Sequence, residues 1–112
     1  MTAFQLADEL VLEVYRVTRQ FPKEEMFGLR SQIRRAAVSV PSNIVEGCAR
    51  DSSKEYLRFL DIAFGSLREL SYQFDLSSRL GFINQDAVPS CAAKILETEK
   101  VLAGLIRALR KA

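Results

Sequence analysis

A proline stands in the middle of a stretch that otherwise has the pattern of an amphipathic helix. Residues 33–47 read IRRAAVSVPSNIVEG, and apolar residues keep helical spacing on both sides of Pro41, from Val40 to Ile44. An interior proline costs a helix one backbone hydrogen bond and clashes with the preceding turn, at about 3 kcal/mol. Because the apolar spacing keeps its phase, we expect one continuous helix; a break into two short helices is the alternative. This combination constrains the chain to a specific helical packing.

Four segments of the chain have helical periodicity: residues 3–20, 26–48, 53–80 and 86–110. The connections between them are short, so sequential helices are expected to pack as antiparallel neighbours. A chain of 112 residues is enough for one domain. We therefore predict a single all-α domain, residues 1–112, folded as an antiparallel up-down-up-down four-helix bundle.

Each predicted helix has an apolar stripe that we expect to face the core. The stripes are Leu6, Leu10, Val14, Val17 and Phe21; Leu29, Ile33, Ala36, Val40, Ile44 and Gly47; Tyr56, Leu60, Ala63, Leu67, Leu70 and Phe74; and Val88, Ala92, Ile95, Leu102, Leu105 and Leu109. Ser52 and Glu55 have the form of a capping box at the start of the third helix. Gly81 is placed to end that helix.

The composition argues against an enzyme. The chain has no histidine, which excludes a Ser-His-Asp triad, a Cys-His pair and a Glu-x-x-His di-iron site. Its glycines are scattered, so no glycine-rich phosphate loop is present. Three carboxylates, Glu46, Asp61 and Glu69, are a poor metal site without histidine. We predict no catalytic residue, no cofactor, no metal and no small-molecule substrate.

The cysteines and the hydropathy pattern bear on location. Cys48 and Cys91 have no Cys-x-x-Cys spacing, and two free thiols are typical of a reducing cytoplasm. The first residues lack the basic segment and uninterrupted apolar run of a signal peptide. No apolar run approaches the ~18 residues of a membrane span. We expect a cytoplasmic protein with no membrane partner.

The third helix has more apolar surface than a simple bundle needs. Beyond its core stripe it carries Leu57, Phe59, Ile62 and Phe64. A bundle helix normally presents one apolar stripe about 100° wide, and exposed apolar patches usually mark protein interfaces. We interpret these four residues as a subunit interface; a helix lying unusually deep in a monomer is the alternative.

Polar residues near the inward faces of the second and third helices suggest a structural network. Asn43 and Glu46 lie on the second helix, and Ser66 and Glu69 lie on the third among apolar neighbours. A lone polar side chain in such a position often fixes helix register. We interpret the four as a structural polar network, with a binding site as the alternative.

Several runs together resemble a known family. Residues 32–47 (QIRRAAVSVPSNIVEG), 56–63 (YLRFLDIA), 65–70 (GSLREL) and 80–83 (LGFI) resemble the four helix bundle proteins, also called 23S ribosomal RNA intervening-sequence proteins. The resemblance covers essentially the whole chain. One departure is Val45, which stands where a small residue is expected.

The resemblance implies a small bacterial protein with a four-helix bundle fold that assembles into ring-like homopentamers. Some members are encoded within insertions in large-subunit ribosomal RNA genes. The family looks similar in architecture to the accessory variability determinant of diversity-generating retroelements, a pentamer that binds nucleic acid and a reverse transcriptase. No catalytic residue is established for the family, so none is carried over.

Two functions remain open at this point. The first is a non-enzymatic oligomeric module that binds RNA or a ribonucleoprotein; the second is a protein-protein scaffold with no direct nucleic-acid binding. A net charge of +2 is too small to decide between them. The candidate RNA contacts are Arg30, Arg34 and Arg35, then Arg16, Arg19 and Lys23, and Arg107, Arg110 and Lys111. The alternative for any one of these clusters is a solvated or salt-bridged helix face.

Overall fold

The computed structural model describes residues 1–112, and the chain forms four long α-helices and no β-strand. The long helices are α1 (Ala3–Val17), α2 (Leu29–Cys48), α3 (Ser53–Arg79) and α4 (Val88–Lys111). Two short 3₁₀ helices, η1 (Lys23–Glu25) and η2 (Gln85–Ala87), precede α2 and α4. The prediction of an all-helical four-helix bundle is confirmed.

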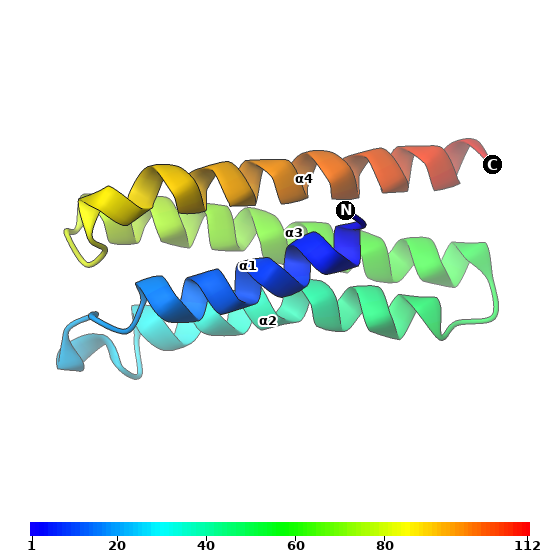
Figure 1. Ribbon diagram of the computed structural model, residues 1–112. Helices are drawn as coiled ribbons and strands as arrows, with labels where there is room; N and C mark the ends of the chain where they lie inside the picture. Colours follow the sequence, from blue (N-terminus) through cyan, green and yellow to red (C-terminus); the bar gives the residue numbers. More distant parts are fainter.

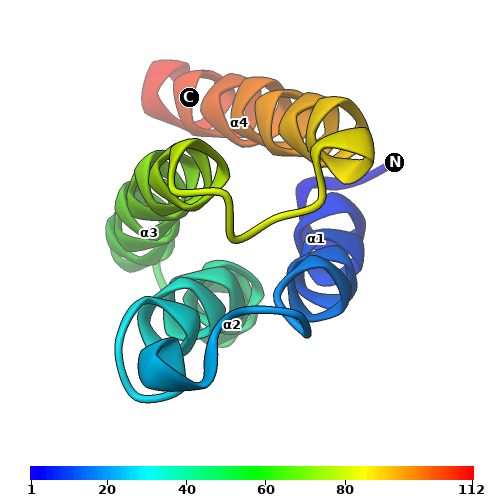
Figure 2. The same cartoon turned by 90° about the vertical axis from the view of Figure 1, so that its left-hand side faces the viewer.

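The helices lie along one another in a body of 45 × 25 × 18 Å, and the connections between them alternate between its two ends (Figure 1). Viewed from the end in Figure 2, the helices occupy the four corners of a square in chain order. Each helix packs on its two neighbours around this square, and the contact between α2 and α3 is the most extensive. The N-terminus lies part-way along the bundle, so the end that carries the C-terminus is built from α2, α3 and α4 (Figure 1).

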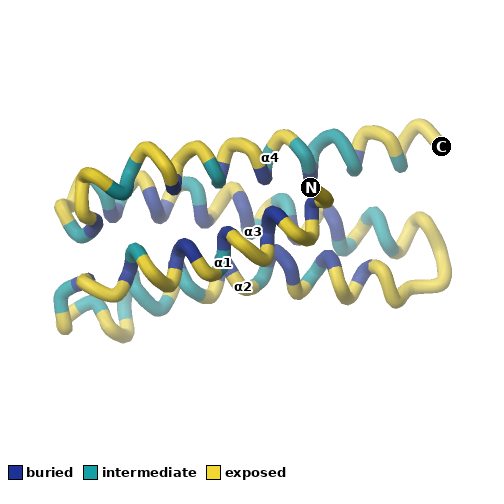
Figure 3. Tube along the Cα trace, in the orientation of Figure 1, coloured by how far each residue is buried: buried dark blue, intermediate teal, exposed yellow.

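Buried residues lie on the sides of the helices that face one another (Figure 3). The predicted stripes of α1, α2 and α3 are confirmed, except that Val17, Leu29 and Tyr56 are only half-buried. The stripe of α4 is partly wrong. Its buried residues are Cys91, Ile95, Thr98, Leu102 and Ile106. Because α4 is apolar on more than one side and contacts both α1 and α3, its periodicity did not define which side faces inward.

Two helix boundaries near the first connection differ from the expected 3–20 and 26–48. α1 ends at Val17, because the backbone then tightens into turns in which Arg19 N donates to Arg16 O and Phe21 N to Thr18 O. These turns bring Phe21 into the core. α2 begins only at Leu29, whose N–H donates to the Glu25 side chain at 3.0 Å.

The second boundary region lies between α3 and α4. α3 ends at Arg79, and Gly81 takes φ +79°, a conformation that strains other residues. Gly81 N donates to Ser78 O and Phe82 N to Ser77 O, which completes a Schellman motif. α4 begins at Val88 instead of residue 86, because the preceding residues form η2.

The start of α3 matches the capping prediction in part. Ser52 Oγ accepts a hydrogen bond from Glu55 N at 3.2 Å, as an N-cap should. The return bond from Ser52 N to the Glu55 carboxylate is not formed, so the cap is not a complete box. A complete capping box is found instead at α1, between Thr2 and Gln5.

α2 runs without interruption from Leu29 to Cys48 with Pro41 inside it. The expectation of a continuous helix is confirmed, and the alternative of two short helices is wrong. Pro41 is buried, and Val40 and Ile44 on either side belong to the core. Packing on both sides of the proline offsets the missing backbone hydrogen bond.

Candidate nucleic-acid interface

Three arginines gather where α2 begins, close to the C-terminal end of α1. Arg30, Arg34 and Arg35 line one side of an open hollow of about 690 Å³. Its nine lining residues include no carboxylate: Tyr15, Met26, Phe27, Arg30, Ser31, Arg34, Arg35, Val38 and Ser39. The hollow therefore combines positive charge with apolar and aromatic surface.

Arg34 is held in place by α1. Its Nε donates to Thr18 Oγ1 at 2.8 Å, and its Nη2 donates to Tyr15 O at 3.2 Å. The guanidinium carbon also lies 4.3 Å from the centre of the Tyr15 ring. Thr18 is fully buried, and its hydroxyl donates a hydrogen bond to Val14 O at 2.7 Å, so its oxygen is oriented to accept from Arg34. Arg34 therefore joins α1 to α2. The sequence predicted an RNA contact for this residue and did not predict this structural role.

The surroundings of Arg34 are positive. Desolvation by burial lowers the pKa of Arg34, and the charges of Arg30 and Arg19 lower it further. Arg34 stays protonated at neutral pH, because the pKa of a guanidinium starts above 12. Because these arginines repel one another, an anion bound among them would reduce the repulsion between their positive charges.

Arg30 and Arg35 form no salt bridge, in contrast to five other arginines of the chain. Ion pairs hold Arg16 to Glu13, Arg50 to Glu46, Arg68 to Glu99, Arg79 to Asp75 and Arg110 to Asp61. Arg35 is exposed and Arg30 is half-buried in the wall of the hollow. Both are thus available to an anion.

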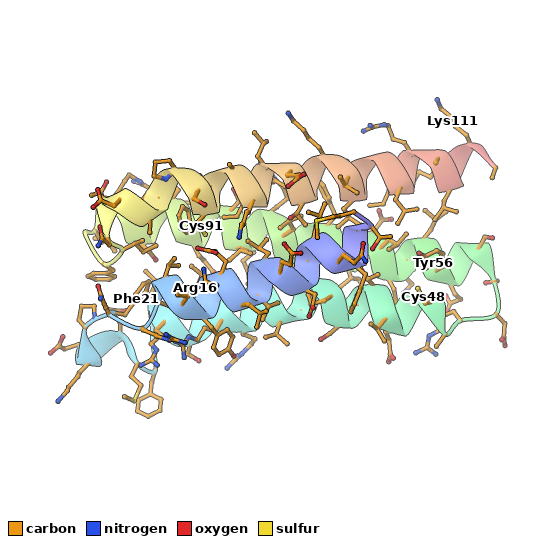
Figure 4. All side chains as sticks on the ribbon, viewed as in Figure 1. Arg16, Phe21, Cys48, Tyr56, Cys91 and Lys111 are labelled. Carbon is orange, nitrogen blue, oxygen red and sulfur yellow. The ribbon has the colours of Figure 1, made fainter.

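The other predicted basic residues divide between the two ends of the bundle. Arg19 and Lys23 are exposed near the α1–α2 connection, whereas Arg107, Arg110 and Lys111 lie on the last turns of α4. Figure 4 shows Lys111 at the opposite end of the molecule from Phe21. Arg110 makes two bonds to the Asp61 carboxylate, at 2.7 and 2.9 Å. The nine candidate residues therefore do not form one surface.

Two of the four residues in the predicted polar network, Asn43 and Ser66, are linked through Ser39, which was not among the four. Asn43 Nδ2 donates to Ser39 O at 2.8 Å and to Ser39 Oγ at 3.0 Å, and Ser39 Oγ lies 2.8 Å from Ser66 Oγ. Ser39 thus links α2 to α3. Glu46 was wrongly placed in the network, because it pairs with Arg50, just beyond the C-terminal end of α2. Glu69 was also wrongly placed, because it is exposed on the outer side of α3.

The four apolar residues assigned to an interface on α3 have different environments. Leu57 and Phe64 pack against the protein's own core. Phe59 is half-buried, with the guanidinium carbons of Arg50 and Arg58 at 4.8 and 5.4 Å from its ring centre. Ile62 alone is strongly exposed, at 41%. On α2, Val38 and Val45 are exposed at 40% and 54%, and the sequence analysis assigned neither to an interface.

Phe27 is the most prominent residue that sequence reasoning missed. It is 93% exposed and lines the hollow beside Met26. It lies between η1 and α2, in the first residues of the predicted 26–48 helix, which the structure leaves outside α2. The available signal was a phenylalanine next to a glycine, a few residues before a pair of arginines.

The opposite end of the bundle carries the exposed thiol. Cys48 and Tyr56 lie together where α2 passes into α3, with Cys48 Sγ 3.8 Å from the Tyr56 hydroxyl (Figure 4). Burial raises the pKa of Tyr56, and the contact with Cys48 raises it further. No group of three or more His, Cys, Asp or Glu side chains is placed to hold a metal ion. None of the helices combines the length and apolar character that a membrane span requires.

Comparison with known proteins assigns a family. Residues 1–104 match the 23S rRNA-intervening sequence protein family. The chain belongs to this family. The resemblance found in the sequence is confirmed. No curated protein matches the chain in sequence.

A solved structure supports the fold. A crystal structure of a protein of unknown function from the S23 ribosomal protein family of Bacteroides thetaiotaomicron superimposes with a TM-score of 0.85 at 22% sequence identity. The match covers 94% of this chain and 98% of that one. At this identity the likeness concerns the helical bundle and not the residues of the hollow.

Proposed function

We propose that this family member is a non-enzymatic, homo-oligomeric module, built on an up-down-up-down bundle in a bacterial cytoplasm, that binds RNA or a ribonucleoprotein. The observation that carries the proposal is the set of arginines in the hollow between α1 and α2. Arg30 and Arg35 have no acidic partner, and Arg34 adds a fixed positive charge beside them.

Arginine suits this role because its planar guanidinium makes two parallel hydrogen bonds to a phosphate. Contacts to phosphates supply most of the affinity for nucleic acid but little sequence selectivity, and they weaken with salt. In a ring of subunits each hollow would be repeated, so several weak contacts would add to a tight complex. A pentamer, the assembly that the family resemblance implies, would present five such surfaces.

The test is binding of a labelled structured RNA to the purified, mass-verified oligomer over a series of salt concentrations. The variant Arg30→Glu with Arg35→Glu reverses the charges of two arginines in the hollow and leaves Arg34 in its structural contacts. The matched control is Lys54→Glu with Lys100→Glu, two exposed lysines without ion pairs that give the same change in net charge. We expect salt-sensitive binding that the arginine variant loses and the lysine variant keeps.

Two results would contradict this proposal. The first is an absence of RNA binding even at low salt. The second is an equal loss in both variants, because binding would then depend on overall charge and not on the hollow.

A protein-protein scaffold is the second candidate, and the exposed apolar side chains favour it. Val45 on α2 and Ile62 on α3 present apolar surface that the chain does not cover itself. A scaffold predicts that charge reversal at Arg30 and Arg35 leaves capture of its partner protein intact. The same surface serves oligomer formation in the first proposal.

A further inference from the structure

Phe27 is exposed, and it stands on a turn whose backbone is hydrogen-bonded. Its neighbours form a hydrogen-bonded turn in which Met26 N donates to Lys23 O and Gly28 N to Glu25 O, both at 3.1 Å. The Glu25 carboxylate then accepts from Leu29 N at 3.0 Å and joins this turn to α2. The turn therefore fixes the backbone of Phe27, whose side chain is 93% exposed and lines the hollow.

The hollow offers two kinds of contact at once. Phe27 and Tyr15 supply aromatic surface, and Arg30 and Arg35 supply unpaired positive charge. A ligand that uses both must carry a planar, uncharged ring and an anionic group a few bonds away. The volume of about 690 Å³ lies within the range of roughly 300–1,000 Å³ that is usual for small-ligand pockets.

We infer that this hollow binds an unpaired nucleotide of single-stranded RNA, with its base stacked on Phe27 and its phosphate held by Arg30 and Arg35. The inference rests on the proposed RNA-binding function and names the kind of RNA. A base within a duplex is stacked on its neighbours and does not expose its face, whereas a base in a loop or a free end is available for stacking on an aromatic side chain.

Arg34 contributes to this arrangement without binding the ligand. Its bonds to Thr18 and Tyr15 hold it against α1, where its charge adds to the potential that attracts phosphate. The same bonds keep the Tyr15 side of the hollow in a constant position relative to Arg30 and Arg35. The site thus exists before a ligand arrives, which lowers the entropic cost of binding.

The chain has no tryptophan, so a single introduced tryptophan reports on this site alone. In Phe27→Trp, a base stacked on the indole is expected to quench its fluorescence. The matched control is Leu96→Trp, which places an indole on α4 at a position that is 51% exposed and outside the hollow. Titration with a short oligouridylate should quench the first protein and leave the second unchanged.

A second measurement uses Phe27→Ala and fluorescence anisotropy of labelled oligouridylate and of a fully paired RNA duplex of equal length. Loss of one base–aromatic stack should weaken single-strand binding by at least about fivefold and leave duplex binding unchanged. Because the ring is exposed, the variant should fold normally, which circular dichroism verifies.

The possible outcomes separate this inference from the proposed function. If both RNAs bind and Phe27→Ala changes neither, the protein binds phosphates without a stacking site, and only this inference is overturned. If no RNA binds, both proposals are overturned. If an acidic peptide quenches Phe27→Trp as strongly as the oligouridylate does, the hollow recognises charge alone, and the nucleotide assignment is again overturned.

Discussion

The guanidinium of Arg34 connects two helices through three contacts. It donates to a buried hydroxyl and to a backbone carbonyl of α1, and it lies over the ring of Tyr15. The neighbouring Arg35, one position further along α2, points to solvent and has no partner. Two adjacent arginines thus differ completely in role, because a step of one residue turns a helical side chain by about 100°.

This difference predicts unequal effects on stability. Arg34→Ala should lower the free energy of unfolding by about 1–2 kcal/mol, because it removes two hydrogen bonds and a cation–π contact. Arg35→Ala, the control, should change it by less than about 0.5 kcal/mol. Urea denaturation monitored by circular dichroism measures both. Equal effects would contradict the structural role of Arg34.

The two cysteines also differ at the residue scale. Burial, followed by the negative charge of Glu13, raises the pKa of Cys91 to about 12, whereas Cys48 is exposed. The reactive form of a thiol is the thiolate, so Cys91 should be inert at ordinary pH. We expect a thiol reagent to modify Cys48 quickly in the folded protein and Cys91 only after denaturant is added. Rapid modification of both would contradict this environment.

The raised pKa of Cys91 also predicts a dependence of stability on pH. An unfolded thiol has a pKa of about 8.5, so the folded state holds this proton more tightly than the unfolded state does. The resulting stabilisation is complete below that value and is lost as the pH rises from about 9 towards 12. The free energy of unfolding should fall between about pH 8 and pH 10 more steeply in wild type than in Cys91→Ala. An equal fall in the free energy of unfolding of the two proteins would contradict the prediction.

At the scale of the helix, two glycines sit in opposite environments. A Cβ added to Gly47 of α2 would lie 2.9 Å from Tyr56 Cδ1 and 3.0 Å from Phe59 Cβ. A Cβ added to Gly65 of α3 would meet no atom within 4 Å. Gly47 therefore permits the close approach of α2 and α3, whereas Gly65 serves no packing purpose within the chain.

Substitution by alanine should have opposite signs at these two positions. Gly65→Ala should raise the free energy of unfolding by about 0.5–1 kcal/mol, because alanine favours the helix over glycine. Gly47→Ala gains the same propensity but crowds the Tyr56 ring and the Phe59 Cβ, with a cost of about 1–3 kcal/mol, so a net loss is expected. Thermal unfolding of the two variants compares them directly. A stabilised Gly47→Ala protein would show that the contact relaxes easily.

At the scale of the whole molecule, the bundle leaves apolar surface uncovered on two adjacent helices. Val45 on α2 and Ile62 on α3 are exposed at 54% and 41%, and these two helices share the most extensive contact in the bundle. An apolar surface on a rigid pair of helices is suited to a contact with another copy of the chain. The subunit interface stays a prediction, now centred on these residues instead of on Leu57 and Phe64.

A charge placed on this surface should disrupt assembly. We expect wild type to be an oligomer by light scattering, and Val45→Glu with Ile62→Glu to have a smaller mass, because a carboxylate is costly to bury. Leu12→Glu with Leu96→Glu adds the same charges at exposed positions of α1 and α4, so it should keep the wild-type mass. A monomeric wild type, or dissociation of the control alone, would contradict an interface on α2 and α3.

The sequence by itself determined the helices, their approximate limits and the inward faces of α1, α2 and α3. Those features follow from local periodicity and from capping residues, such as Ser52 and Gly81, that act within a few residues of their own position. The continuity of α2 through Pro41 could also be predicted, because it follows from the spacing of apolar residues on the two sides of the proline. The family could be assigned because several such local patterns occur together in one order.

Tertiary structure alone decided which polar and basic residues work together. Arg34 meets Thr18 across sixteen positions of sequence, and Ser39 meets Ser66 across twenty-seven, so no local pattern could pair them. The same holds for the hollow, whose aromatic and basic walls come from α1, α2 and the turn between them. Packing sets these distances, and packing depends on where the helices lie relative to one another, which periodicity along one helix does not encode.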